Sequence, residues 1–223
     1  MKKYVDVLRR CRLFYGIADE HMFAMLGCIG GKVRAYQKEE TILAEGDPAG
    51  ELGIVLSGAV QIVRIDYYGN RSIVASMEPS QLFGESFSCA EIGSMPVNVV
   101  AAADTEVMLL NAKRITGTCG NACSFHKQLI FNLLKAVAVQ NLLFHQKIEI
   151  ISKRSTREKL MTYLLFEAKR QGSDSFTIPY DRQELADYLE VDRSGLSAEI
   201  SKLRKEGKLE SRRNYFKLFH LEI

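Results

Sequence analysis

The spacing of apolar residues changes twice along this chain of 223 residues. After an opening with helical spacing, residues 32–110 form short apolar segments separated by turn residues such as Gly46-Asp47-Pro48 and Ser57-Gly58. Turns at such regular intervals are typical of antiparallel strands in a β-sandwich or barrel. Gly and Asn tolerate the positive φ of tight hairpin turns, so Gly69-Asn70 predicts a hairpin tip.

Between residues 121 and 152 the apolar period becomes that of a helix. Leu129, Leu133 and Ala136 recur at intervals of three and four, and the pattern continues to Ile151. Such a helix would span roughly 45 Å, which is more than a small globular domain usually needs. An apolar stripe of that length predicts packing against a second copy of the chain. Burial against the chain's own barrel is the alternative, and the stripe is wide enough for both.

The last third of the chain predicts one helix followed by two short helices that are joined by a tight turn. The first helix covers residues 156–171 and ends at Gly172. Asp181 and Glu184 then have the spacing of a capping box, which satisfies the free amides of a helix start. The next apolar stripe ends at Gly207, and the following residues alternate like a hairpin around Arg212-Arg213-Asn214. This order predicts a winged helix-turn-helix.

The charge distribution favours a DNA-binding role for this region. Residues 1–152 carry equal numbers of basic and acidic side chains, so the net charge of +3 lies entirely in residues 153–223. The outward positions of the second short helix are Arg193, Ser194, Ser197, Lys202 and Arg204. Side chains of these types contact phosphates and base edges. Helix packing with a solvated basic surface and no DNA is the alternative.

Several other classes of protein do not fit. The chain opens without the apolar run of a signal peptide, and no stretch approaches the roughly 18 apolar residues of a membrane span. We therefore expect a cytoplasmic protein without a membrane partner. The five cysteines are irregularly spaced, unlike a secreted disulfide framework.

An enzyme is the competing class, because β-barrels also build cupin-type metal sites. Such sites need clustered His ligands, yet no His lies between Met22 and Phe125. The chain also lacks a nucleophile elbow and a phosphate-binding loop. We predict no enzymatic activity, no catalytic residues, no metal and no resident cofactor.

Three stretches carry a family resemblance: residues 46–60, residues 81–86 and residues 182–194. They resemble, in this order, the jelly-roll signature, the start of the effector-binding cassette and the helix-turn-helix of the CRP/FNR superfamily of bacterial transcription factors. The resemblance implies an α+β chain with three parts. The first part, residues 1–120, is an antiparallel β jelly-roll that acts as a cyclic-nucleotide-binding-like sensor. The second is a long dimerisation helix over 121–152, and the third is a winged helix-turn-helix DNA-binding domain over 153–223.

The resemblance also implies a homodimer that reads a palindrome in double-stranded DNA, with RNA polymerase as a further partner. Effector binding between barrel and long helix would shift DNA affinity. Arg193 and Ser194 are expected at base edges. The full expected DNA-binding set is Arg182, Arg193, Ser194, Ser197, Lys202, Arg204, Arg212, Arg213 and Lys217. Ala198 stands where many relatives carry arginine and Glu199 follows it, so a module that has lost DNA binding stays an alternative.

The effector is not expected to be cyclic AMP. Cyclic-nucleotide-binding relatives hold the phosphate with an arginine, whereas the matching stretch Ser94–Asn98 has none, and a buried unpaired phosphate is costly. An unknown small organic effector, uncharged or weakly acidic, suits the apolar lining. The alternative is a pocket filled by these side chains, with no ligand. Glu85 either contacts a ligand or caps backbone amides. The expected effector-pocket residues are Phe83, Gly84, Glu85, Ser86, Cys89, Met95, Val97, Gln140, Asn141, Leu143 and Phe144.

Redox and haem sensing are further alternatives within the same fold. An iron–sulfur cluster needs four thiolates, and Cys11 and Cys28 stand alone near the N-terminus. Cys119, Cys123 and His126 form a Cys-x3-Cys-x2-His pattern at the start of the long helix, where a thiol pKa would fall. A redox or metal role there competes with simple packing. No histidine lies in a haem-attachment signature.

Overall fold

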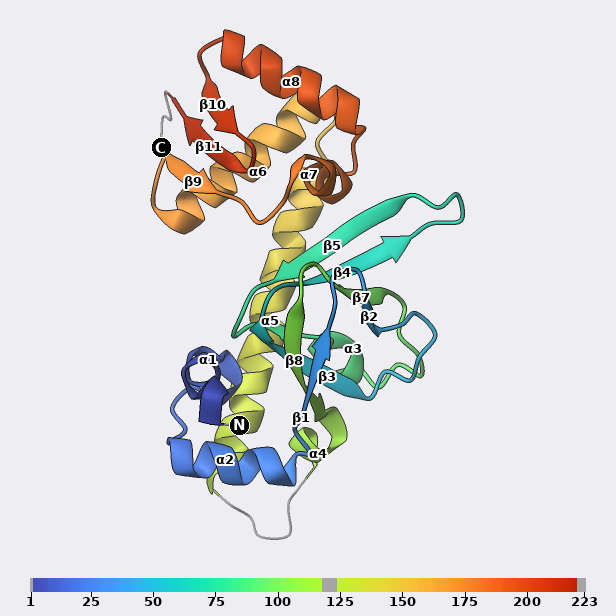
Figure 1. The fold of residues 1–223 in the computed structure, drawn as a ribbon, viewed down its shortest axis with the longest axis vertical. Helices are drawn as coiled ribbons and strands as arrows, with labels where there is room; N and C mark the ends of the chain where they lie inside the picture. The colour runs from blue at the N-terminus through green and yellow to red at the C-terminus, as the bar shows by residue number, and fades with distance from the viewer. Residues whose placement is uncertain (1, 118–123, 220–223) are drawn as a thin grey trace. The chain divides into compact units, whose positions relative to one another are not determined.

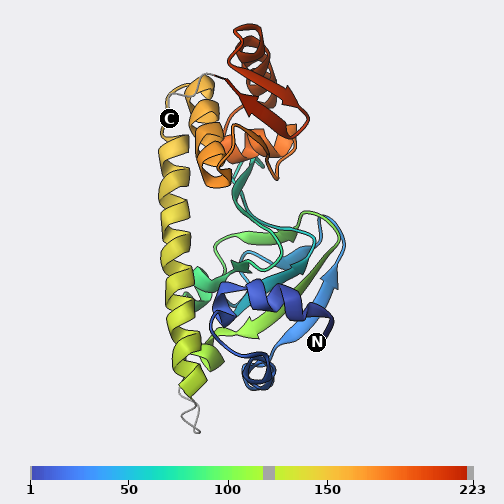
Figure 2. The ribbon, with the colours of Figure 1, turned by 90° about the vertical axis from the view of Figure 1, so that its left-hand side faces the viewer.

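The computed structural model describes residues 2–117 and 124–219, and the chain forms two compact units. Residues 1–68 and 74–141 make up the first unit, and residues 69–73 and 142–223 make up the second. Helix α5 (Ser124–Ile151) runs without interruption (Figures 1 and 2) and belongs in part to each unit. The long helix predicted from the apolar spacing is thus confirmed over its described residues.

Two four-stranded sheets form the barrel of the first unit. Their strand orders are β1-β8-β3-β6 and β2-β7-β4-β5, and neighbours such as β3 and β8 pair antiparallel, with Ile54 opposite Met108. A turn with Gly69 at φ +83° joins β4 to β5, as the Gly69-Asn70 pair predicted. The predicted jelly-roll is confirmed. The strands are β1 (Lys32–Tyr36), β2 (Thr41–Leu43), β3 (Glu51–Ser57), β4 (Val60–Ile65), β5 (Arg71–Met77), β6 (Leu82–Phe83), β7 (Asn98–Ala101) and β8 (Thr105–Asn111).

Strand β3 is buried on both faces because two cores meet at it. Val55 belongs to the core between the two sheets, while Ile54 belongs to a second core outside the barrel. Gly53 lies under the ring of Phe83: a Cβ at residue 53 would come within 2.0 Å of that ring. The absence of a side chain at residue 53 therefore lets a fully buried phenylalanine fill the barrel at this level.

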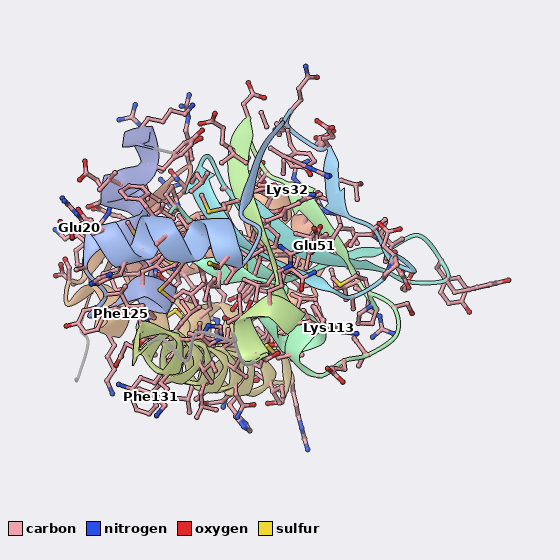
Figure 3. All side chains as sticks on the ribbon, turned by 90° about the horizontal axis from the view of Figure 1, so that it is seen from below. Glu20, Lys32, Glu51, Lys113, Phe125 and Phe131 are labelled. Carbon is pink, nitrogen blue, oxygen red and sulfur yellow. The ribbon has the colours of Figure 1, made fainter. Side chains whose placement is uncertain are left out.

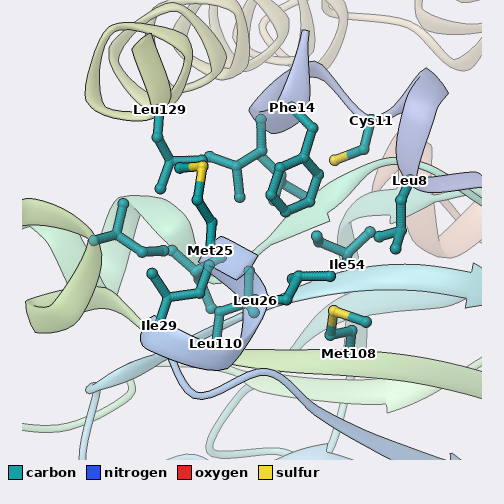
Figure 4. Close-up of a cluster of buried hydrophobic side chains, with 14 of the residues drawn as sticks. Leu8, Cys11, Phe14, Met25, Leu26, Ile29, Ile54, Met108, Leu110 and Leu129 are labelled. Carbon is teal, nitrogen blue, oxygen red and sulfur yellow. The ribbon is translucent and has the colours of Figure 1, made fainter. Parts of the chain in front are cut away.

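The second core joins the barrel to the N-terminal helices and to α5. In Figure 4, Phe14, Met25 and Leu129 converge on barrel residues such as Leu110. The amide of Asn132 on α5 is buried and donates to the carbonyls of Leu13 and Tyr15. The short helices of this unit are η1 (Lys2–Tyr4), α1 (Val5–Arg10), η2 (Arg12–Phe14), α2 (Asp19–Cys28), α3 (Glu85–Cys89) and α4 (Ala112–Thr116).

The second unit is a helix-turn-helix followed by a hairpin. Helix α6 (Thr156–Gln171) ends at Gly172, which has φ +64°. Helix α7 (Arg182–Leu189) begins with the predicted capping box of Asp181 and Glu184. Helix α8 (Arg193–Lys205) buries one apolar stripe and is followed by the hairpin (Figure 1). The sheet has the order β10-β11-β9, with β9 (Ser175–Thr177), β10 (Leu209–Arg212) and β11 (Tyr215–Leu218).

Candidate nucleic-acid interface and effector site

The outward face of α8 offers basic and hydroxyl side chains to solvent. Leu196, Ile200 and Leu203 are buried, which turns the opposite face outward. The N-terminal residues Arg193 and Ser194 are exposed there. Of the other α8 residues predicted from the sequence, Lys202 and Arg204 are exposed, whereas Ser197 is half-buried.

Two residues that the sequence prediction missed lie on the same face. Ser201 and Lys205 are exposed and follow Ser194 and Ala198 at helical intervals of three and four. That spacing was the signal that could have identified them. A stripe of small side chains with a lysine at its end lets a helix approach the floor of a major groove closely.

Arg182 is a half-buried cation, and one of its nitrogens is buried without a hydrogen-bond partner in the described part of the chain. It is the first residue of α7, its guanidinium carbon lies 5.9 Å from the centre of the Phe216 ring, and its Nη1 has no hydrogen-bond partner among the described residues. Burial, and then the nearby positive charge of Arg193, lower the pKa of Arg182. Two repelling guanidinium groups beside a helix start form a region that an anion would stabilise.

The hairpin after α8 carries the predicted basic tip. Arg212 ends β10, and Arg213 occupies the turn with φ +55°, a conformation that non-glycine residues rarely adopt. Both side chains are exposed and form no ion pair with the described residues, and Lys217 is half-buried on β11. The arginines are therefore available to an external anion.

Glu199 does not lie on the outward face. Its carboxylate accepts from Nε of Arg157 at 2.5 Å, and Arg157 also donates to Glu206 at 2.6 Å. The hydrogen bonds with Glu206 and, second, with Glu199 raise the pKa of Arg157. Through these contacts Arg157 links α6 to α8. Lys202 lies 3.8 Å from the same Glu199 carboxylate. The acid that suggested a loss of DNA binding is thus neutralised within the unit.

Helix α5 has an exposed, mostly apolar stripe as well as its buried one. Leu129, Leu133 and Ala136, the residues from which packing against a second copy was predicted, are buried in the second core of their own chain, which was the alternative. Phe131 and Leu134 are 50% and 64% exposed, and Figure 3 shows Phe131 pointing away from the barrel. The exposed stripe follows alternating intervals of three and four, the seam pattern of paired helices. Its members are Phe131, Leu134, Ala138, Asn141, His145 and Ile148.

The predicted effector residues fall into two groups. Phe83, Met95 and Val97 are buried together in the barrel core, and Glu85 is 3% exposed at the start of α3, following Gly84 at φ +77°. The Glu85 carboxylate accepts a hydrogen bond from its own backbone amide, while burial raises its pKa. Ser86 lies in α3, and Cys89 ends it and packs against the second core.

The second group lies on α5. Gln140 and Phe144 are half-buried, whereas Asn141 and Leu143 are exposed. Asn141 is also a member of the exposed stripe. A ligand between the two groups stays a prediction.

The described residues give no support for a metal site or for a redox site. Within residues 2–117 and 124–219, no three His, Cys, Asp or Glu side chains are grouped as a metal ion requires. Cys119 and Cys123 lie outside the described residues. Burial raises the pKa of Cys11 to about 12, which makes that thiol unreactive. None of the described helices is long and apolar enough to span a bilayer.

Two family models match the two units. A cyclic nucleotide-binding domain matches residues 33–121, and a Crp-like helix-turn-helix domain matches residues 158–222. The chain belongs to the CRP/FNR superfamily. CRP/FNR proteins are DNA-binding transcription regulators. The fold class expected from the sequence resemblance, a β jelly-roll, a long helix and a C-terminal helix-turn-helix, is confirmed.

Curated CRP/FNR relatives are distant. The chain is 24% identical over 183 residues to the transcriptional activator protein FnrA of Stutzerimonas stutzeri, covering 80% of this chain and 72% of that protein. It is 25% identical over 174 residues to the nitrogen fixation regulation protein FixK of Rhizobium meliloti, covering 78% and 75%.

Solved CRP/FNR structures share the fold. FixK2 of Bradyrhizobium japonicum superposes with a TM-score of 0.68 at 24% identity, covering 84% of this chain and 92% of that one. The c-di-GMP responsive regulator CLP of Xanthomonas campestris has a TM-score of 0.74 at 18% identity, covering 92% and 100%.

Proposed function

We propose that this CRP/FNR-type regulator binds a palindromic DNA site as a homodimer paired along the exposed stripe of α5. Helix α8 enters the major groove, with Arg193 and Ser194 at base edges. Arg182, Arg204, Arg212 and Arg213 contact phosphates. Binding of a small effector at the barrel shifts the dimer between states with different DNA affinity, and RNA polymerase is the downstream partner.

The observation that carries this proposal is the pair of neighbouring positive charges on Arg182 and Arg193. The two guanidinium groups lie at the start of α7 and the start of α8, where backbone amides also favour an anion. A DNA backbone phosphate beside these two groups neutralises their repulsion. If Arg182 and Arg193 served only to stabilise the unit, an acidic side chain would be expected beside them, as Glu199 and Glu206 lie beside Arg157.

A selection from random DNA tests the proposal. Reduced, ligand-free protein is incubated at about 0.1 M salt with duplexes carrying about 30 random base pairs, and the retained duplexes are sequenced. We expect a palindrome with half-sites about one helical turn apart. A parallel selection contains the small-molecule fraction of a bacterial extract, so that a ligand-dependent regulator is also detected. Retention of random sequences in both selections would contradict the proposal.

We further propose that the effector is not a cyclic nucleotide. In the stretch Ser94–Asn98, Met95 and Val97 are buried side chains of the barrel core, and no arginine is present to pair with a phosphate. Cyclic AMP at about 1 mM is therefore expected to leave the melting temperature unchanged in a thermal unfolding assay. A ligand at about 100 times its Kd adds roughly 2.7 kcal/mol to the unfolding free energy. A shift of several degrees with cyclic AMP would refute this assignment.

A further inference from the structure

Lys147 is a buried lysine on the part of α5 that belongs to the second unit. Its side chain is only 7% exposed, and the nearby Ile150 is 2% exposed. A buried ammonium group needs hydrogen-bond acceptors and electrostatic partners to offset the loss of water. The partners of Lys147 come from α7, the first helix of the helix-turn-helix.

Both the backbone and the side chain of Tyr188 meet this ammonium group. Nζ of Lys147 donates to the carbonyl oxygen of Tyr188 and lies 3.7 Å from the centre of the Tyr188 ring. The ring is itself fixed, because it stacks on Tyr180 at 4.8 Å and contacts Tyr163 at 5.2 Å. The cation therefore touches a rigid group at the last turn of α7.

A second lysine covers the adjacent carbonyls of the same helix end. Glu190 has φ +53°, and the amides of Glu190 and Val191 both donate to the carbonyl of Ala186. This closure leaves the last carbonyls of α7 to other donors. Nζ of Lys159, on α6, donates to the carbonyls of Leu189 and Glu190 at 3.2 Å each. Two cations thus face the negative end of the α7 dipole.

The carbonyls held by these lysines directly precede the recognition helix. Glu190 is three positions before Arg193, the first residue of α8. We propose that Lys147 is a positioning residue for DNA recognition: its charged contact with the end of α7 fixes the turn that sets the start of α8. Lys147 then couples α5 to the DNA-reading surface. This inference rests on the proposed function, and no role in sequence reading or effector contact is required of Lys147 itself.

The charge of Lys147 gives the proposal a pH signature. Burial lowers the pKa of Lys147 to about 8; Glu190, the residue that follows α7, opposes this effect, and Lys159 on α6 adds to it. The folded protein therefore holds this proton less tightly than the unfolded chain does. By linkage, Lys147 makes the unfolding free energy rise with pH between about 8 and 10.5. The positioning contact weakens over the same range, so stability and DNA affinity are expected to move in opposite directions.

The test compares three variants of the full-length protein. Lys147→Met removes the charge and keeps the length of the side chain. Lys147→Arg keeps a positive charge that does not titrate. Lys159→Met is the control, because Lys159 contacts the same turn from α6 and is more exposed. The probe is the duplex that the wild-type protein recovers in the selection. Affinity is measured at about pH 7 and about pH 9, together with the melting temperature and amide hydrogen exchange of residues 190–196.

We expect Lys147→Met to weaken binding at pH 7 by about tenfold, a typical size for coupling, with an equal or higher melting temperature and faster exchange in residues 190–196. Wild-type affinity should fall towards pH 9, and Lys147→Arg should show no such fall. Lys159→Met should have the smaller effect. Unchanged affinity and exchange in Lys147→Met would overturn the inference, as would a loss of affinity that merely follows a lower melting temperature. If the wild type selects no sequence, the proposed function fails, while the exchange measurement still decides whether Lys147 fixes the turn.

Discussion

Leu134→Arg is expected to convert the protein into a monomer of 25.1 kDa and to abolish tight binding to its palindromic site. Leu134 belongs to the α5 stripe and is 64% exposed, so the substitution leaves the fold of one chain intact. In a dimer each arginine would face its symmetry mate in an apolar seam, and two unpaired charges would be buried together. A single helix-turn-helix then loses the avidity of two linked half-sites, which is typically worth about 100-fold or more.

The measurement is sedimentation or light scattering, followed by titration of the selected duplex. Gln146→Arg is the matched control, because it introduces the same charge at an exposed position of α5 that is not in the stripe. This control is expected to remain dimeric and to bind normally. A Leu134→Arg protein that keeps twice the monomer mass and binds the duplex as before would show that another surface forms the dimer.

The elements that the sequence predicted best are those with local determinants. The boundaries of α6 followed from the apolar period and from Gly172, which adopts the positive φ of a helix end. Asp181 and Glu184 mark the start of α7 because the two hydrogen bonds of a capping box involve residues three apart. Such interactions depend only on near neighbours, so the sequence contains all the information they need.

The partners of buried side chains were beyond this local reasoning. Strand β3 could be predicted from its composition, but not its burial on two faces, which depends on α1 and α2 packing outside the barrel. From the sequence alone, Lys147 is one polar residue within the predicted long helix. Its environment depends on Tyr188, which is far along the chain and is brought beside it by the fold of the second unit. Periodicity identifies a face of a helix and does not identify what covers it.

In the candidate DNA surface, too, some features could be predicted from the sequence and others depend on distant partners. Arg193 and Ser194 were predicted because they begin the recognition helix, and they are exposed. Glu199 looked unfavourable for DNA binding because its partner Arg157 belongs to another helix and could not be assigned from spacing. The orphan nitrogen of Arg182 likewise depends on burial beside Phe216, a residue of the hairpin. Charge type was readable in the sequence, whereas charge pairing required the structure.

Arg193→Ala is expected to remove base discrimination at one position of each half-site. An arginine that donates to O6 and N7 of guanine is worth about 1–3 kcal/mol of discrimination against other bases, and a palindrome doubles the number of such contacts. Affinity for the selected duplex should therefore fall by about 100-fold, while affinity for random DNA changes little. A second selection with the variant should recover a motif that is relaxed at the corresponding symmetric positions.

Arg213→Asn is the matched comparison for this experiment. Arg213 has φ +55°, which asparagine tolerates, so the hairpin tip keeps its backbone and loses only its charge. A phosphate contact carries no sequence information, so this variant should bind every duplex more weakly by a similar factor. The slope of log affinity against log salt should also become shallower by about 1 per subunit. If Arg193→Ala instead weakened all sequences equally and changed the salt slope in the same way, Arg193 would be a phosphate contact, and base reading would have to be assigned to other residues on the outward face of α8.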